Sequence, residues 1–158
     1  MSTFDAEGLR ILTDAECLRM LASVPVGRVV FHEGGLPAVR VVNFAVDGWS
    51  VVFRSAAGGK TRAAERGDVV AFEVDRYDAD RHLGWTVTVI GHASLVTDPR
   101  EVDEVMRLPI ARWAPGPHSQ IVRIGIESVA GRSVVPWAQR PRDQGTKALP
   151  GVGARAQA

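Results

Sequence analysis

The sequence contains little of what extracellular or membrane proteins need. Cys17 is the only cysteine among 158 residues, so no disulfide can form within the chain. The segment Met1–Arg10 is polar and lacks the apolar stretch of a signal peptide. The longest apolar runs, such as Thr86–Ile90, are far shorter than a membrane span. We therefore expect a cytoplasmic protein that has no membrane partner.

Charge of one sign is not concentrated anywhere along the chain. The 19 basic and 18 acidic residues give a formal net charge of +1, and no block of like charge stands out. A protein that binds nucleic acid normally shows clustered lysine and arginine residues. The sequence therefore predicts no nucleic-acid partner.

The motifs of several enzyme classes are also missing. The four histidines do not have the spacing of metal ligands, so we expect no metal site. There is no Gly-x-Ser-x-Gly nucleophile elbow and no Rossmann fingerprint, and Gly58–Thr61 lacks the first glycine of a Walker A loop. The sequence names no catalytic residue.

What the sequence does contain is the pattern of a small antiparallel barrel. β-Branched and aromatic residues form about six short segments separated by turn residues, which is typical of strands joined by hairpins. Asp47-Gly48 is the strongest hairpin signal. The expected strands are 28–31, 37–46, 49–53, 69–74, 84–96 and 121–129, followed by a short seventh over 132–135. An all-β fold with peripheral helices follows.

Three short helices should lie around this barrel. Thr13 and Glu16 have the spacing of a capping box, which predicts a helix over about 14–22. A second helix is expected over 60–66, and a third begins after Asp98, an N-cap followed by proline.

The chain should form one domain with a tail. Its length fits a single domain over residues 1–139. Residues 140–158 are rich in proline and glycine and show no periodicity, so we expect them to form a flexible C-terminal tail.

A compact phosphate receptor is predicted in the segment 54–66. A strand delivers Arg54 and Ser55 to its end, Gly59 frees the backbone, and Lys60 opens a helix. Peptide N–H groups at a helix start bind anions, and the charged side chains add stronger donors. The same residues are also compatible with a solvated basic turn that leads into a surface helix.

The strand 38–44 is unusual because polar residues interrupt an apolar run. Side chains alternate along a strand, so Arg40 and Val42 share one face while Val39, Val41 and Asn43 share the other. A planar heteroaromatic ligand along this edge could use both the peptide groups and the polar side chains. Alternatively, Arg40 points outward on a solvated face of the sheet.

Three aromatic residues are further candidates for ligand contact. Trp85 stands at a strand start, where it either contacts a ligand or fills the mouth of the barrel. Trp113 and His118 bound a loop that contains two prolines and a glycine. Such a stiff loop can hold a large aromatic residue against a ligand or a dimer interface.

In this order, these stretches resemble the pyridoxamine 5′-phosphate oxidase-like flavoproteins over roughly residues 10–135. The motifs that carry the resemblance are Val26-Gly-Arg-Val-Val-Phe31, Pro37-x-Val-Arg-x-Val-Asn-Phe44, Val52-Phe-Arg-Ser55, Gly59-Lys60, Val70-Ala-Phe-Glu-Val-Asp75 and Gly84-Trp85. The resemblance implies a six-stranded antiparallel split β-barrel that binds FMN between the subunits of a homodimer.

The resemblance also implies roles for individual residues. The strand Val39–Phe44 would border the isoalloxazine ring, and Arg54, Ser55 and Lys60 would hold the ribityl phosphate. Trp85 and the loop Trp113–His118 would approach the flavin from either subunit. The implied function is that of an FMN-binding oxidoreductase or flavin reductase acting on a small molecule.

Some positions depart from the family pattern. Gly59 stands where related sequences often carry serine, and Val41 where they often carry proline. The stretch Val129–Gln139 has no counterpart of the substrate motif of true pyridoxamine phosphate oxidases, so vitamin B6 oxidation is not implied. A deazaflavin-dependent reductase and a non-catalytic flavin-binding module are the alternative functions on the same fold.

Overall fold

A single antiparallel sheet organises the computed structural model, which describes residues 3–114, 116–136 and 139. The eight strands follow the order β1-β8-β6-β5-β2-β3-β4-β7, and a further pairing of β6 with β7 closes six of them into a barrel. The elements are β1 (Arg10–Ile11), α1 (Asp14–Leu21), β2 (Val26–Glu33), β3 (Leu36–Val46), β4 (Ser50–Ser55), α2 (Gly59–Arg66), β5 (Val69–Asp78), β6 (Leu83–Leu95), α3 (Pro99–Met106), β7 (Gln120–Gly125) and β8 (Ser128–Val134). The expected six-stranded antiparallel barrel is confirmed.

The long strand β6 belongs to two parts of the sheet because it changes partners. Gly84–Ile90 pair with β8, whereas Ala93–Leu95 pair with β7. Gly91 lies between them, where a side chain would overlap the carbonyl oxygen of Gly125. The close approach of these two backbones allows β6 to complete the barrel.

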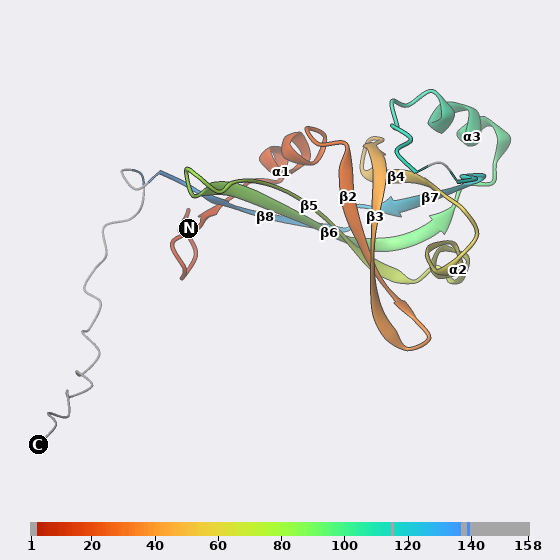
Figure 1. Cartoon of the computed structure of the whole chain (residues 1–158), viewed down its shortest axis with the longest axis horizontal. Coiled ribbons are helices and arrows are strands. Elements are labelled where there is room, and N and C mark those ends of the chain that lie inside the picture. Colours follow the sequence, from red (N-terminus) through yellow and green to blue (C-terminus); the bar gives the residue numbers. More distant parts are fainter. Residues whose placement is uncertain (1–2, 115, 137–138, 140–158) are drawn as a thin grey trace, which may run out of the picture.

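Beyond the barrel, the sheet continues as an extension. Figure 1 shows the β5–β6 hairpin and β8 reaching toward α1 and the N-terminus, while α2 and α3 lie at the opposite end of the molecule. The β2–β3 hairpin crosses this long pair of strands. The two ends of the molecule therefore carry different elements, and the pocket described below lies at the end with α2 and α3.

Two apolar clusters hold the helices against the strands. The main core fills the barrel, where the rings of Phe44 and Phe72 meet edge to face with centroids 4.8 Å apart. α1 packs Cys17 and Leu21 into the same core. A second cluster joins α3 to the barrel through Val105 and leads into the segment that follows the helix. Its buried members are Val52, Val96, Val105, Ile110 and Ile121.

Local sequence signals predicted the helix starts correctly. The Thr13 side chain accepts a hydrogen bond from the Glu16 N–H, and the Glu16 carboxylate accepts one from the Thr13 N–H. At α3, the Asp98 carboxylate accepts hydrogen bonds from the N–H groups of Arg100 and Glu101. These caps satisfy peptide donors that have no partner within the helix.

The expectation of one strand over 121–129 was wrong. The chain turns at Ile126–Glu127, so that the segment forms β7 and the start of β8, and β8 also includes most of the predicted strand 132–135. This turn lacks proline and asparagine and is held by tertiary hydrogen bonds instead. Ile126 N–H donates to the Trp49 carbonyl, and Glu127 N–H donates to the Ile90 carbonyl.

Two further expectations concern the C-terminal residues and the lack of membrane-spanning segments. Residues 140–158 lie outside the described residues, so the flexible tail stays a prediction. Across the described ranges, no helix combines the length and the apolar character that crossing a membrane requires.

The close approach of the backbone at Gly91 to Gly125 can be tested with a variant of each glycine, and the Gly125 variant is the control. Gly91→Ala should lower the free energy of unfolding by roughly 2–3 kcal/mol, because the methyl group meets backbone that cannot move aside. Gly125→Ala should change it by less than about 1 kcal/mol, since a Cβ there meets nothing. Urea denaturation of both variants provides the measurement. Equal stability of the two variants would show that the strand crossing tolerates a side chain.

Candidate functional site

A pocket of about 190 Å³ opens where β3, β4, the start of α2 and the segment after α3 meet. Its polar lining consists of arginine, lysine, histidine and uncharged side chains, and among the described residues no carboxylate contributes to it. The lining residues are Val41, Val42, Asn43, Arg54, Ser55, Lys60, Ile110, Ala111, Arg112, Trp113, Ala114 and His118.

The wall formed by β3 exists because this strand parts from β4. β3 pairs with β2 from Leu36 to Asn43, whereas it pairs with β4 only from Phe44 to Val46. In the described part of the chain, the edge of β3 before Phe44 therefore has no second neighbouring strand. Peptide groups on such an edge need a hydrogen-bond partner, which water or a ligand can supply.

The opposite end of the pocket carries the predicted phosphate receptor. Ser55 ends β4 and is 2% exposed, with its hydroxyl donating to the Ala56 carbonyl at 2.8 Å. Arg54 donates to the Met106 carbonyl through Nη2 at 3.4 Å. Lys60 lies in the first turn of α2. Together they direct positive charge and the start of a helix toward one place, which favours an anionic group.

Lys60 is held where its positive charge is not fully compensated. The pKa of Lys60 is lowered, mainly because burial removes water from the ammonium group and also because Arg40 repels it. Glu33 opposes this shift. A bound anion would stabilise the charged form of this lysine.

Two donors in the pocket lining have no hydrogen-bond partner within the described residues. These are Asn43 Nδ2 and Arg54 Nε, both of them buried. Buried donors are nearly always paired, because an unpaired one costs about 1–3 kcal/mol. Other buried atoms without a partner belong to residues outside this lining, namely Gln120, Arg123 and Ser133. Both donors are available to a ligand that accepts hydrogen bonds in this pocket.

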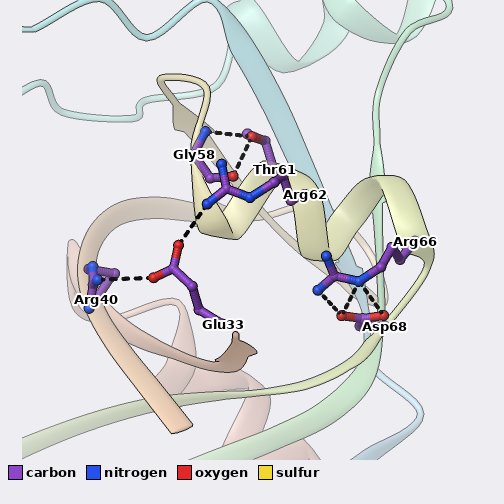
Figure 2. Close-up of polar contacts among 7 residues, drawn as sticks. All are labelled: Glu33, Arg40, Gly58, Thr61, Arg62, Arg66 and Asp68. Atoms are coloured by element: carbon purple, nitrogen blue, oxygen red, sulfur yellow. Dashed lines mark hydrogen bonds and ion pairs between the residues drawn. The ribbon is translucent and has the colours of Figure 1, made fainter. Parts of the chain in front are cut away.

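The start of α2 is arranged by the chain itself. Gly58 N–H donates to the Thr61 hydroxyl, which donates in turn to the Gly58 carbonyl, each at 2.9 Å (Figure 2). Gly59 does not line the pocket; a Cβ there would overlap the Glu33 carboxylate. Gly59 therefore makes room for Glu33, and the cofactor contact expected of it from the sequence stays a prediction.

Most of the residues expected to contact a ligand meet in this pocket. The structure brings together Val41, Val42, Asn43, Arg54, Ser55, Lys60, Trp113 and His118. Val39 and Arg40 do not line it. Val39 is 51% exposed, and Arg40 pairs with Glu33 at 3.4 Å.

Trp85 does not line this pocket. It lines a second hollow of about 70 Å³ on the extension of the sheet, together with Leu9, Tyr77 and Arg132. Within one chain, Trp85 therefore does not contact a ligand bound near Lys60. Its expected approach to a cofactor from a second subunit stays a prediction.

The sequence interpretation missed the first part of the loop after α3. Ile110 packs into the second apolar cluster and carries Arg112 to the pocket. The loop is also tied to β3, because the Asn43 side-chain oxygen accepts a hydrogen bond from the Trp113 N–H at 3.4 Å. The cationic Arg112 directly before a tryptophan was the signal available in the sequence.

Comparisons with known proteins agree with this geometry. Residues 13–133 match the family described as pyridoxamine 5′-phosphate oxidase. The chain belongs to this family. Rv0080, an uncharacterised Mycobacterium tuberculosis protein, is 39% identical over 131 residues, which cover 80% of this chain and 86% of the relative.

Two solved structures of flavoproteins share the fold of this family member. The FAD-binding protein of Mycobacterium smegmatis is 31% identical and superposes with a TM-score of 0.64, covering 78% of this chain and 95% of its own. A FAD-binding protein of Mesorhizobium loti is 25% identical with a TM-score of 0.70, covering 80% and 99%. The chain thus has the flavin-binding split-barrel fold of the pyridoxamine 5′-phosphate oxidase family.

The exposed Trp113 provides a test of the apolar end of the pocket. Its side chain is 69% exposed, and a ring bound against it would remove much of that surface from water. We expect the pocket to hold a flavin ring against Trp113, so Trp113→Ala should weaken the binding of FMN and of riboflavin alike, by about fivefold to tenfold in each case.

Trp49→Ala is the matched control for this experiment. Trp49 is 61% exposed but does not line the pocket, so its loss should leave both affinities unchanged. Fluorescence titration with each flavin measures the effect. If both tryptophan variants bound flavin as tightly as the wild type, the loop would have no part in the site.

Proposed function

We propose that this chain binds a flavin nucleotide in the pocket and serves as an oxidoreductase that acts on a small molecule. The FMN unit of the cofactor, which FAD also contains, would place its phosphate beside Arg54, Ser55 and Lys60. Its ring would lie along Val41–Asn43. The two buried donors of the pocket lining that lack partners, Asn43 Nδ2 and Arg54 Nε, are the observation that carries this proposal.

The charge of the pocket fits a phosphate. Arg54, Lys60 and Arg112 line it without a carboxylate among the lining residues. A phosphate monoester carries close to two negative charges at neutral pH and offers several acceptor oxygens. Arg54 Nε, which has no partner in the described chain, is a suitable donor to such a group.

The ring end of the pocket fits a heteroaromatic molecule. Val41 and Trp113 offer apolar surface, while the Asn43 amide and the free edge of β3 offer polar groups. When bound, the flavin supplies the electron chemistry. The protein residues bind it, orient its ring and exclude water from one of its faces, and none of these tasks requires an acid–base pair.

A second copy of the chain would complete the site. Val39, Val41 and Trp113 are 51%, 67% and 69% exposed, so apolar side chains on and beside the pocket wall face water. A symmetric dimer would bury this surface together with the cofactor.

We propose the cytoplasm as the location, supported by the single cysteine.

The dimer is expected in solution when the cofactor is present. Light scattering on the protein with FMN at micromolar concentration should give a mass near twice that of the 17.0 kDa chain. A mass equal to one chain under these conditions would contradict a cofactor site shared between subunits.

Truncation of Lys60 tests the phosphate end of the pocket. Lys60→Ala should weaken FMN binding by about one to two orders of magnitude, because a charge-assisted contact to a dianion contributes roughly 1.5–3 kcal/mol. Riboflavin lacks the phosphate, so it should bind the wild type and the variant equally weakly. Calorimetric titration of both flavins against both proteins gives the four affinities.

Two outcomes of these titrations would change the proposal. Unaltered FMN affinity in Lys60→Ala would show that Lys60 is a solvated surface residue and that the phosphate lies elsewhere. Binding of a deazaflavin cofactor in strong preference to FMN would assign the pocket to deazaflavin chemistry. Steady-state assays with nicotinamide donors then establish turnover, and their failure with the flavin bound would identify a non-catalytic binding module.

A further inference from the structure

Arg112 is an arginine of the pocket lining whose charge has no partner. The other arginine of the lining, Arg54, donates to the Met106 carbonyl at 3.4 Å. Arg112 makes no hydrogen bond and no ion pair in the part of the chain that the structure describes, and it is exposed. A guanidinium group that lines a pocket in this way can bind an anion without first giving up another contact.

The fold fixes the backbone of Arg112 from both sides. Two residues before it, Ile110 is 9% exposed and packs into the second apolar cluster. One residue after it, the Trp113 N–H donates to the side-chain oxygen of Asn43 at 3.4 Å. Because Asn43 belongs to the wall formed by β3, the backbone of Arg112 is held beside the place proposed for the flavin ring.

The cofactor phosphate and the protein together leave the charge of Arg112 unbalanced. A phosphate monoester carries close to two negative charges at neutral pH, which Arg54 and Lys60 can balance. Glu33, the carboxylate that acts on Lys60, is engaged by Arg62 at 2.8 Å and by Arg40 at 3.4 Å (Figure 2). One positive charge of the pocket lining therefore remains for a second anion that carries a single charge.

We propose that Arg112 determines substrate specificity, and that the substrate is a small planar molecule with one carboxylate group. This inference rests on the proposed function. A guanidinium group binds a carboxylate through two parallel hydrogen bonds, so Arg112 suits a monoanion of this kind. The rest of the substrate must lie against the flavin ring to exchange electrons with it, and a planar body with few polar groups fits there.

Benzoate and benzamide are matched probes for this inference. They have the same ring and nearly the same shape, but only benzoate carries a charge at neutral pH. In the protein saturated with FMN, benzoate should bind about fivefold to tenfold more tightly than benzamide, because only the carboxylate pairs with Arg112. The change in flavin absorbance on binding provides the measurement, which requires no turnover.

The chain offers a matched control for testing Arg112. Arg107 is exposed at the end of α3, on the same side of the sequence, but does not line the pocket. Arg112→Gln should weaken benzoate binding by about fivefold to tenfold and change the binding of benzamide and of FMN by less than about twofold. Arg107→Gln should leave all three affinities unchanged, which excludes a general effect of removing positive charge.

Several results would overturn the inference. Equal binding of the two probes by the wild type would do so, as would benzoate binding that Arg112→Gln leaves unchanged or that both variants weaken alike. Weaker FMN binding in Arg112→Gln would assign Arg112 to the cofactor phosphate, and loss of the dimer in light scattering would assign it to the subunit interface. In each of these cases the wild type still binds FMN, so only the inference fails. If the wild type did not bind FMN, the proposed function would fail as well.

Discussion

The separation of β3 from β4 at Phe44 is the constraint on which the site depends. Phe44 is 4% exposed and pairs with Phe53 of β4, so the two strands are held together at this point, and its ring meets Phe72 of β5 in the core. Before Phe44, β3 stays with β2 while β4 runs on toward α2. The barrel is therefore split on one side, and the pocket lies in the split. Its walls are a strand edge, a helix start and a loop held by the second apolar cluster.

Positive charge accumulates in this split without a balancing carboxylate in the lining. A folded protein gains little from partly burying cations such as Lys60, because burial removes the water that stabilises them. An anion bound beside these cations would offset the cost of partly burying their charge. The unpartnered donors of Asn43 and Arg54 agree with this, since a ligand that accepts hydrogen bonds would satisfy both of them. We therefore expect a ligand bound in this pocket to stabilise the fold.

The sequence predicted features that depend on a few neighbouring residues. The Thr13 cap and the hairpin at Asp47-Gly48 are of this kind and both are present, and the helix expected from Lys60 begins one residue earlier, at Gly59. Features that depend on tertiary contacts were not predictable. The turn at Ile126–Glu127 is held by residues far away in the sequence, and the direction of Arg40 is set by Glu33. In the same way, Arg112 reaches the pocket because Ile110 packs under α3, which no local pattern indicates.

A crystal structure of the protein with FMN tests the central claim most directly. The account predicts that the phosphate contacts Arg54, Ser55 and Lys60 and that the ring lies against Val41–Asn43, with Asn43 Nδ2 and Arg54 Nε now paired. Electron density for the flavin at another place, with both donors still lacking a partner, would contradict it.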